Sequence, residues 1–270
     1  MPRDSRRTHS LRLLFLGSGS SGNATLVSGD SGSVLVDCGF SAKETLRRLS
    51  LHDVPAEEIR AILITHEHTD HTAGVRILAK RLNVPVFASS GTRRAGRLDY
   101  LIEDVRGLEA GEETSIAGLR VRAFRTSHDA ADPIGFRFDA ATGDSFGLVT
   151  DTGEFTPEAA EALTGCTFLG IEHNHDETML ANGPYPHFLK RRISSSFGHL
   201  SNTAASEALL QLAHDGLQAV AGLHVSRTNN RSEIVSGSLS ASISSVGLDI
   251  PVTCVAQDRP CMMPLPATCA

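Results

Sequence analysis

A short segment, residues 65–71, places four potential metal ligands between the end of an apolar strand and the start of a helix. The ligands are His66, His68, Asp70 and His71. In an extended turn, histidines two residues apart point the same way, and the helical turn that follows brings the aspartate and the third histidine to a second position. One segment can therefore serve two metal ions, although a histidine-rich surface loop is the alternative. Because the segment completes neither site alone, the fold must bring further strand ends to the same place.

Three more candidate ligands each follow a predicted strand. They are His128, Asp151 and His224. Taken alone, each is better explained as a hydrogen-bonded loop residue. Together with the first segment they make five histidines and two aspartates, enough for two divalent metal ions bridged by one carboxylate. No cysteine joins the set, which favours zinc or manganese, and then iron, over Cu(I).

Strands and helices alternate along the whole chain, which predicts an α/β fold. Strands are predicted at 11–16, 25–27, 33–37, 61–65, 84–88, 119–125, 134–138, 146–150, 167–172, 218–223 and 252–255. Helices are predicted from a capping box at 41–44, from 69 up to Pro85, and at 157–163, 186–193, 203–214 and 230–246. A single domain of two sheets flanked by helices fits this order better than two domains.

Length and composition fit an ordinary globular protein. The chain has 270 residues, of which 40% are hydrophobic and 21% charged, a balance that argues against disorder. No apolar stretch approaches the roughly twenty residues of a membrane helix, and no apolar signal region follows the basic start. The five cysteines show no CxxC spacing and indicate reduced thiols, so we expect a cytoplasmic protein without membrane contact. We expect a disordered arm at 1–10, one domain at 11–257 and an irregular tail at 258–270.

The seven candidate ligands resemble the dimetal ligand set of the metallo-β-lactamase superfamily. This resemblance covers about residues 11–256 and implies a hydrolase with an αβ/βα four-layer sandwich, in which two mixed β-sheets are flanked by helices. It assigns one metal to His66, His68 and His128, the other to Asp70, His71 and His224, and the bridging position to Asp151. Asp37 stands at the early aspartate position of the family, where we expect a structural residue rather than a ligand.

Further segments narrow the resemblance. Residues 197–202 and 223–226 are similar to the phosphodiesterase branch that includes ribonuclease Z. The glycine- and serine-rich loop at 17–23, segment 172–176, the Tyr185-Pro186 pair and the basic run 190–192 are most similar to the YycJ (WalJ) group. This similarity implies a 5′→3′ DNA exonuclease. Residues expected to contact the substrate are Asn23, Lys190, Arg191 and Arg192.

Phosphodiester hydrolysis is chemically coherent with these residues. Two metals about 3.5–4 Å apart can clamp a phosphate and provide a metal-activated hydroxide at neutral pH. Asp70 could orient or deprotonate the nucleophile. The leaving alkoxide needs a proton, for which His199 is the candidate general acid, with Glu172 fixing its tautomer. Capping of the next helix is the alternative role for His199. Three nearby residues could either support the ligands or only pack within a loop: His173, His175 and Asp176.

Three functions remain open at this point. The first is a dimetal phosphodiesterase acting on DNA 5′ ends, supported by His199 and by the basic run. The second is hydrolysis of a small cyclic phosphate, phosphodiester, thioester or lactone, which the net charge of −6 mildly favours. The third is a non-catalytic metal-binding module, against which the joint presence of Asp70 and His199 argues. The sequence leaves homo-oligomer formation open.

Overall fold

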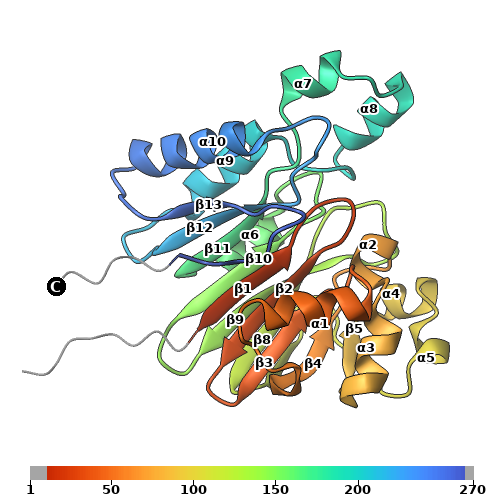
Figure 1. Ribbon diagram of the computed structural model, residues 1–270. Coiled ribbons are helices and arrows are strands. Elements are labelled where there is room, and N and C mark those ends of the chain that lie inside the picture. The colour runs from red at the N-terminus through yellow and green to blue at the C-terminus, as the bar shows by residue number, and fades with distance from the viewer. Residues whose placement is uncertain (1–10, 265–270) are drawn as a thin grey trace, which may run out of the picture.

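Most strands of the chain are buried along nearly their whole length, which requires cover on both faces of each sheet. The structure is a computed structural model that describes residues 11–264. Within that range, two seven-stranded sheets pack face to face, and helices cover the outer face of each (Figure 1). The predicted αβ/βα four-layer sandwich is therefore confirmed.

The first sheet has the strand order β14-β1-β2-β3-β4-β5-β6. Its strands are β1 (Arg12–Gly17), β2 (Ala24–Gly29), β3 (Gly32–Val36), β4 (Ile59–Leu63), β5 (Val86–Ala88), β6 (Val105–Gly107) and β14 (Cys261–Met262). Strands β1 to β3 are antiparallel, whereas β3 to β6 run parallel. The carboxyl ends of β3 and β4 therefore meet at one edge of this sheet.

The second sheet has the order β13-β12-β11-β10-β9-β8-β7. Its strands are β7 (Glu113–Ile116), β8 (Leu119–Arg125), β9 (Ile134–Ala140), β10 (Ser145–Val149), β11 (Phe168–Glu172), β12 (Ala219–Leu223) and β13 (Val252–Cys254). Strands β10 to β13 are parallel, so the carboxyl ends of β10, β11 and β12 also lie side by side.

Helices occupy the two outer layers. They are α1 (Ala42–Ser50), α2 (Thr69–Thr72), α3 (Val75–Leu82), α4 (Ser90–Ala95), α5 (Leu98–Leu101), α6 (Pro157–Leu163), α7 (Glu177–Asn182), α8 (His187–Ile193), α9 (Asn202–Leu212) and α10 (Ser232–Ser245), with a 3-10 turn, η1, at Ala56–Glu58. Helices α1 and α3 cover the first sheet, and α9 and α10 cover the second, while α7 and α8 project from the body at the top of Figure 1. No helix within residues 11–264 is long and apolar enough to cross a bilayer.

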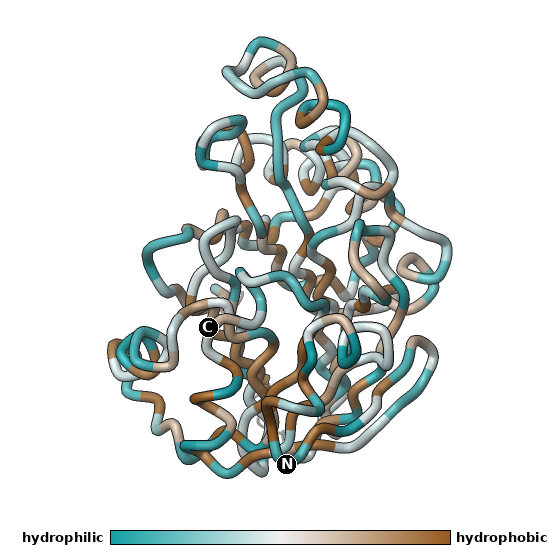
Figure 2. The backbone as a smooth tube through the Cα atoms, turned by 90° about the vertical axis from the view of Figure 1, so that its right-hand side faces the viewer, coloured by the Kyte–Doolittle hydropathy of each residue, from teal (hydrophilic) through white to brown (hydrophobic). Residues whose placement is uncertain are grey.

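Three apolar layers hold the sandwich together. The central layer lies between the sheets and includes Phe15, Phe136 and Phe146, all fully buried. A second layer packs the first sheet against α1 and α3, and a third packs the other sheet against α6, α9 and α10. Figure 2 shows the matching concentration of apolar residues, in brown, along the strands. This packing gives the strand ends fixed positions.

Three expectations about the elements need correction. The helix predicted from Thr69 is broken into α2 and α3 around Gly74, where only glycine fits because a Cβ would lie 2.2 Å from the carbonyl oxygen of Phe40. Elements between 90 and 116 were not predicted, since each has only three to six residues and shows no clear period. The predicted irregular tail at 258–270 contains β14, which pairs with β1 and covers its open edge. Residues 1–10 and 265–270 lie outside the described part of the chain.

Candidate metal centre

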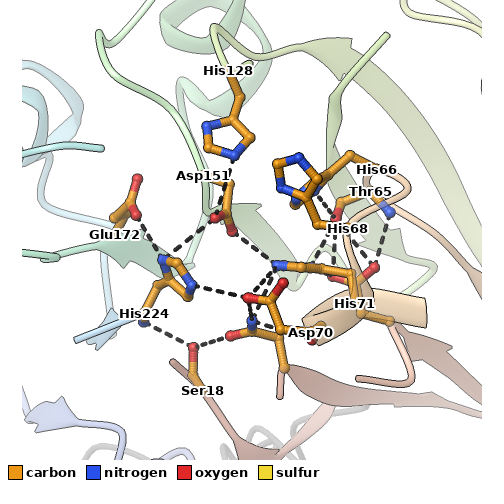
Figure 3. Close-up of polar contacts among 12 residues, drawn as sticks. Ser18, Thr65, His66, His68, Asp70, His71, His128, Asp151, Glu172 and His224 are labelled. Carbon is orange, nitrogen blue, oxygen red and sulfur yellow. Dashed lines mark hydrogen bonds and ion pairs between the residues drawn. The ribbon is translucent and has the colours of Figure 1, made fainter. Parts of the chain in front are cut away.

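Three site residues occupy a left-handed backbone conformation directly after a buried strand. Asp37 has φ 60°, Asp151 has φ 56° and His224 has φ 52°. Such angles are uncommon for residues other than glycine, but aspartate and histidine adopt them more readily than most. They follow β3, β10 and β12, so the chain turns sharply where the two sheets face each other. This conformation brings the side chains of both sheets to one place (Figure 3).

The first candidate ligand group joins three histidines. His66 and His68 come from the loop after β4, and His128 comes from the loop after β8. The ring centroids of His66 and His68 lie 4.6 Å apart, and each lies within 5.2 Å of the His128 centroid. One nitrogen from each ring lies within 4.8 Å of the others, a spacing that can hold a metal ion. The structure thus brings together the three histidines predicted to share a metal.

The second group consists of Asp70 and His71, from α2, and His224. Asp70 Oδ2 lies 3.6 Å from His71 Nε2 and 3.6 Å from His224 Nε2. Asp151 lies between the two groups: its Oδ2 is 3.2 Å from His71 Nε2, and its Oδ1 is 3.9 Å from His128 Nε2. All seven predicted ligands therefore converge, with Asp151 placed to reach both groups (Figure 3).

The ring nitrogens that face away from the centre are hydrogen-bonded. Nδ1 of His71 donates to Asp37 Oδ2 at 2.8 Å, and Nδ1 of His128 donates to the Gly198 carbonyl at 2.9 Å. Donation from Nδ1 leaves the lone pair on Nε2 for a metal, the usual arrangement around metal-binding histidines. Among the described residues, the buried Nε2 atoms of His66 and His224 have no hydrogen-bond partner. Buried polar atoms are rarely left so, and a bound cation accounts for both.

The electrostatics of the centre favour a cation. Burial alone lowers the pKa of His224, but the charge of Asp151, the nearby Asp70 carboxylate and the hydrogen bond to Glu172 raise it to about 10. Burial likewise lowers the pKa of His71, and Asp37 and Asp151 raise it well above its ordinary value. The buried carboxylates therefore stabilise positive charge here, which a divalent metal ion would supply. Imidazole nitrogens and carboxylate oxygens form a donor set that suits such an ion.

Glu172 ends β11 and connects the ligand set to a residue outside it. Its Oε1 accepts hydrogen bonds from Nδ1 of His199 at 2.8 Å and from Nδ1 of His224 at 2.9 Å. Its Oε2 accepts from the backbone N–H of Thr152 at 2.9 Å. Burial raises the pKa of Glu172, but the charge of His199 and the hydrogen bonds from both histidines outweigh it and hold the pKa at about 2. Glu172 is therefore an ionised carboxylate that fixes the orientation of both rings.

His199 does not cap the helix that follows it. The N-cap of α9 is Ser201, whose hydroxyl accepts from the backbone N–H of Ala204. His199 instead lines a cavity of about 290 Å³ that also touches His128 and residues of α8. With Nδ1 held by Glu172, the other nitrogen of the ring, Nε2, is left to act on a molecule bound there.

The four residues expected to contact the substrate are placed differently from one another. Arg192 lines the cavity and donates from Nε to Asp129 Oδ2 at 2.6 Å. Arg191 is exposed on α8. Lys190 donates to the Ala181 carbonyl at 2.6 Å and so connects α8 to α7 rather than facing the cavity.

Asn23, the fourth, is only 5% exposed, and its contact with substrate stays a prediction. Its Oδ1 accepts hydrogen bonds from the Ser18 hydroxyl and the Gly19 N–H, and its backbone N–H donates to the Asp70 carbonyl at 2.8 Å. Asn23 thereby holds the glycine-rich loop against the segment that carries Asp70. Its Nδ2 also lies 3.1 Å from Nε2 of His71 and 3.5 Å from Oδ2 of Asp70, so the side chain contacts the ligand segment directly.

The three residues left open by the sequence pack rather than contact the ligands. Asp176 caps α7, accepting from the Met179 N–H at 2.8 Å. His173 is fully buried, with Nδ1 donating to the Ile171 carbonyl, and burial lowers its pKa to about 4. His175 is also buried, and within residues 11–264 neither histidine hydrogen-bonds a candidate ligand.

Sequence reasoning missed two polar contacts of the centre. The Ser18 hydroxyl accepts from the backbone N–H of His224 at 2.8 Å, which ties β1 to β12 across the sandwich. Asp129 Oδ1 lies 3.4 Å from His128 Nε2 and forms part of the cavity wall. Because Asp129 directly follows His128 in the sequence, its presence at the centre could have been predicted. No feature of the sequence near Ser18 indicates its contact with His224.

Comparison with known proteins agrees with this geometry. Residues 33–222 match the model of the beta-lactamase superfamily domain, which is more than half of the chain. The chain belongs to the beta-lactamase superfamily. This superfamily member is 32% identical over 245 residues to exodeoxyribonuclease YycJ of Bacillus anthracis, covering 89% of this chain and 92% of that protein. It is 34% identical over 227 residues to exodeoxyribonuclease WalJ of Streptococcus pneumoniae, covering 82% and 83%.

Solved structures of beta-lactamase superfamily members share the fold. The metallo-beta-lactamase fold protein YhfI of Bacillus subtilis superposes with a TM-score of 0.70 at 15% identity, covering 93% of this chain and 99% of that one. The short form of human tRNase Z gives a TM-score of 0.64 at 16% identity, covering 94% and 100%. Family membership, the named relatives and the converging ligands together make this chain a metal-dependent hydrolase.

Proposed function

We propose that the chain is a dimetal nuclease that degrades DNA from the 5′ end. The observation that carries this proposal is the position of His199, held by Glu172 at the wall of the cavity and outside the seven predicted ligands. Hydrolysis of a DNA strand needs such a group because the departing sugar oxygen is a strong base. The relatives named exodeoxyribonuclease support the choice of DNA.

Each of the two ligand groups would hold one metal ion, and Asp151, which lies near both His71 and His128, would contribute to both. We propose that the two ions are zinc or manganese, and iron is compatible with the same donors. Divalent ions bound there would neutralise phosphate charge and lower the pKa of a bound water towards 7. Asp70 uses Oδ2 towards the ligand histidines and leaves Oδ1 to orient the attacking water and to accept its proton.

His199 supplies the proton at the other end of the reaction. As the bond between phosphorus and the departing sugar oxygen breaks, Nε2–H of the protonated ring donates to that oxygen. Glu172 keeps Nδ1–H engaged throughout, so the ring cannot rotate away from the cavity. General acid catalysis of this kind typically contributes about 10²–10⁴ in rate.

A small phosphodiester or cyclic nucleotide is the second candidate substrate. The observation in its favour is the cavity itself, whose volume of about 290 Å³ is modest and whose wall includes Asp129. The net charge of −6 agrees, since proteins that bind long nucleic acids usually carry a stronger basic surface. Thioester hydrolysis has no such support, because a thiolate departs without the proton that His199 is placed to give, and nothing in the cavity favours a lactone.

The metal-loaded protein should be incubated with linear DNA labelled at either end. If the proposal holds, a 5′ label is released at once as a mononucleotide, whereas a 3′ label stays on progressively shorter fragments. A closed circular DNA of the same sequence should stay intact, and RNA and cyclic nucleotides serve as competing substrates. Early release of the 3′ label contradicts the polarity, and turnover of a cyclic nucleotide with intact DNA favours the second candidate.

A further inference from the structure

Two phenylalanines are exposed beside the cavity that His199 lines. The chain contains eleven phenylalanines, and nine of them are buried or half-buried in the described range. The exceptions are Phe188, which is 69% exposed, and Phe197, which is 59% exposed. Large aromatic side chains are normally buried, so two exposed rings next to one functional cavity indicate a surface that binds something.

Both rings stand on segments that form the cavity wall. Phe188 lies on α8 directly before Leu189 and one helical turn before Arg192, both of which line the cavity. Phe197 directly precedes Gly198 and His199. Residues three or four apart share a face of a helix, so the ring of Phe188 borders the face that carries Arg192.

The loop that carries Phe197 is fixed in place. The carbonyl of Phe197 accepts a hydrogen bond from the backbone N–H of Asp129, and the hydroxyl of Ser127 donates to the carbonyl of Ser196 at 2.7 Å. The ring of Phe197 is therefore exposed on an anchored backbone. Such a ring loses little entropy on binding, which suits it to stacking.

The charges around the two rings indicate what they contact. Arg191 is exposed on α8 and forms no ion pair with any described residue, whereas Arg192 pairs with Asp129. A free guanidinium beside exposed aromatic rings is the combination by which proteins hold single-stranded nucleic acid, with phosphate contacts and base stacking. Helices α7 and α8 project from the body (Figure 1), and α8 contributes Leu189 and Arg192 to the cavity wall.

We propose that Phe188 and Phe197 stack on unpaired bases of the DNA strand whose end enters the cavity, while Arg191 contacts a backbone phosphate. This inference rests on the proposed function and specifies that its substrate is held as unpaired nucleotides. Stacking is sequence-tolerant because every base presents a π-face, which suits an exonuclease that degrades strands of any sequence. A protein partner would need a larger continuous apolar patch than two rings separated by charged side chains.

Fluorescence anisotropy on 5′-phosphorylated single strands with phosphorothioate linkages tests the stacking. Phe188→Leu or Phe197→Leu should weaken binding by about 5- to 140-fold, the range expected for one stacked base. Phe188→Tyr keeps the aromatic face and should bind within a few-fold of the wild type. Tyr100 is 89% exposed on α5 and does not line the cavity, so Tyr100→Leu is the matched control with unchanged affinity.

Oligonucleotides with a single abasic site identify the contacted base. In the wild type, an abasic site at the stacked position should cause the same loss as Phe188→Leu, and combining the two should cause no further loss. Hydrolysis of bis-p-nitrophenyl phosphate should be unchanged in every variant. The stacking proposal is overturned if the leucine variants bind DNA with wild-type affinity. It is also overturned if the loss of affinity caused by a leucine substitution adds fully to the loss caused by the abasic site.

These outcomes distinguish the stacking proposal from the proposed nuclease function on which it rests. A wild-type protein that shortens DNA from the 5′ end but is insensitive to both leucine substitutions contradicts only the stacking proposal. A wild-type protein that neither binds nor cleaves DNA, while it hydrolyses a cyclic nucleotide, contradicts the proposed function and the stacking proposal together.

Discussion

Asp37 accepts a hydrogen bond from Nδ1 of His71 at 2.8 Å, so a residue that ends β3 orients a candidate metal ligand on α2. The other oxygen of Asp37 accepts from the backbone N–H of Thr65 at 2.9 Å, where the chain leaves β4. One carboxylate therefore connects two strand ends and the ligand helix. Its expected structural role is consistent with these contacts.

Removing the charge of Asp37 should weaken metal binding without removing a ligand. Asparagine tolerates the left-handed backbone at this position, so Asp37→Asn should fold while losing the carboxylate that holds His71. Metal affinity, measured by competition with a chromophoric chelator, should fall by about 10–100-fold. The exposed Asp30 offers a control, and Asp30→Asn should bind metal normally. Unchanged affinity in Asp37→Asn would show that His71 is oriented without this bond.

The bridging position of Asp151 predicts an unequal effect of two ligand substitutions. Asp151→Asn should lower the occupancy of both metal positions, because Asp151 lies within 3.2 Å of His71 Nε2 and 3.9 Å of His128 Nε2. His128→Ala should chiefly empty one position, since His128 belongs to a single group. Elemental analysis after loading with zinc or manganese measures the stoichiometry. Loss of both ions from His128→Ala, with Asp151→Asn retaining one, is incompatible with the bridging role.

The basic run on α8 should act on DNA through Arg191 more than through Lys190. Arg191 is free to meet a phosphate, whereas Lys190 is engaged with the Ala181 carbonyl. Arg191→Gln should therefore weaken DNA binding and reduce the slope of log affinity against log salt by about 1. Lys190→Gln is the matched control and should leave that slope close to the wild-type value. Equal slopes in the two variants would contradict this division of roles.

His173 should make the folded state sensitive to acid. Burial lowers its pKa from the ordinary 6.5 to about 4, opposed in part by the Ile171 carbonyl and by Glu172. Between these values the unfolded state binds more protons, so the free energy of unfolding falls as pH drops from 6.5 towards 4, by up to about 1.4 kcal/mol per pH unit. The free energy of unfolding of the metal-free protein, measured with urea at several pH values, should depend less steeply on pH in His173→Leu than in the wild type. Identical slopes would mean that other groups cause the acid sensitivity.

The sequence could predict that the seven candidate ligands converge, because much of the evidence for it was local. His66, His68 and Asp70 lie in one segment, and the more distant ligands follow recognisable apolar strands. Residues that follow the carboxyl ends of neighbouring parallel strands lie close together at one edge of the sheet. The same reasoning explains why the sandwich and most of its long elements were predicted.

What the sequence could not predict depends on contacts between distant segments. Ser18 meets the backbone of His224 across 206 positions, and no feature near Ser18 indicates that bond. The interior placement of Asn23 depends on the same packing. Strand β14 has only two residues and forms because β1 offers an open edge. The carbonyl of Phe40 approaches Gly74 too closely for any side chain, and nothing near Gly74 in the sequence indicates that contact.

The central claim is that His199 gives a proton to the leaving group and binds no metal. Glu172 is a less clean target because its carboxylate also holds His224, so Glu172→Gln should disturb metal binding as well as proton transfer. His199→Ala removes only the proposed donor. A p-nitrophenolate leaving group departs without a proton, so it separates general acid catalysis from the remaining chemistry.

The deciding measurement compares His199→Ala with the wild type on DNA and on bis-p-nitrophenyl phosphate, with metal content determined on the same samples. We predict full metal content, a loss of about 10²–10⁴ in the rate of DNA hydrolysis and a much smaller loss on the nitrophenyl ester. Equal losses on both substrates, or loss of a metal ion from the variant, would show that His199 is a ligand or a structural residue and not the acid.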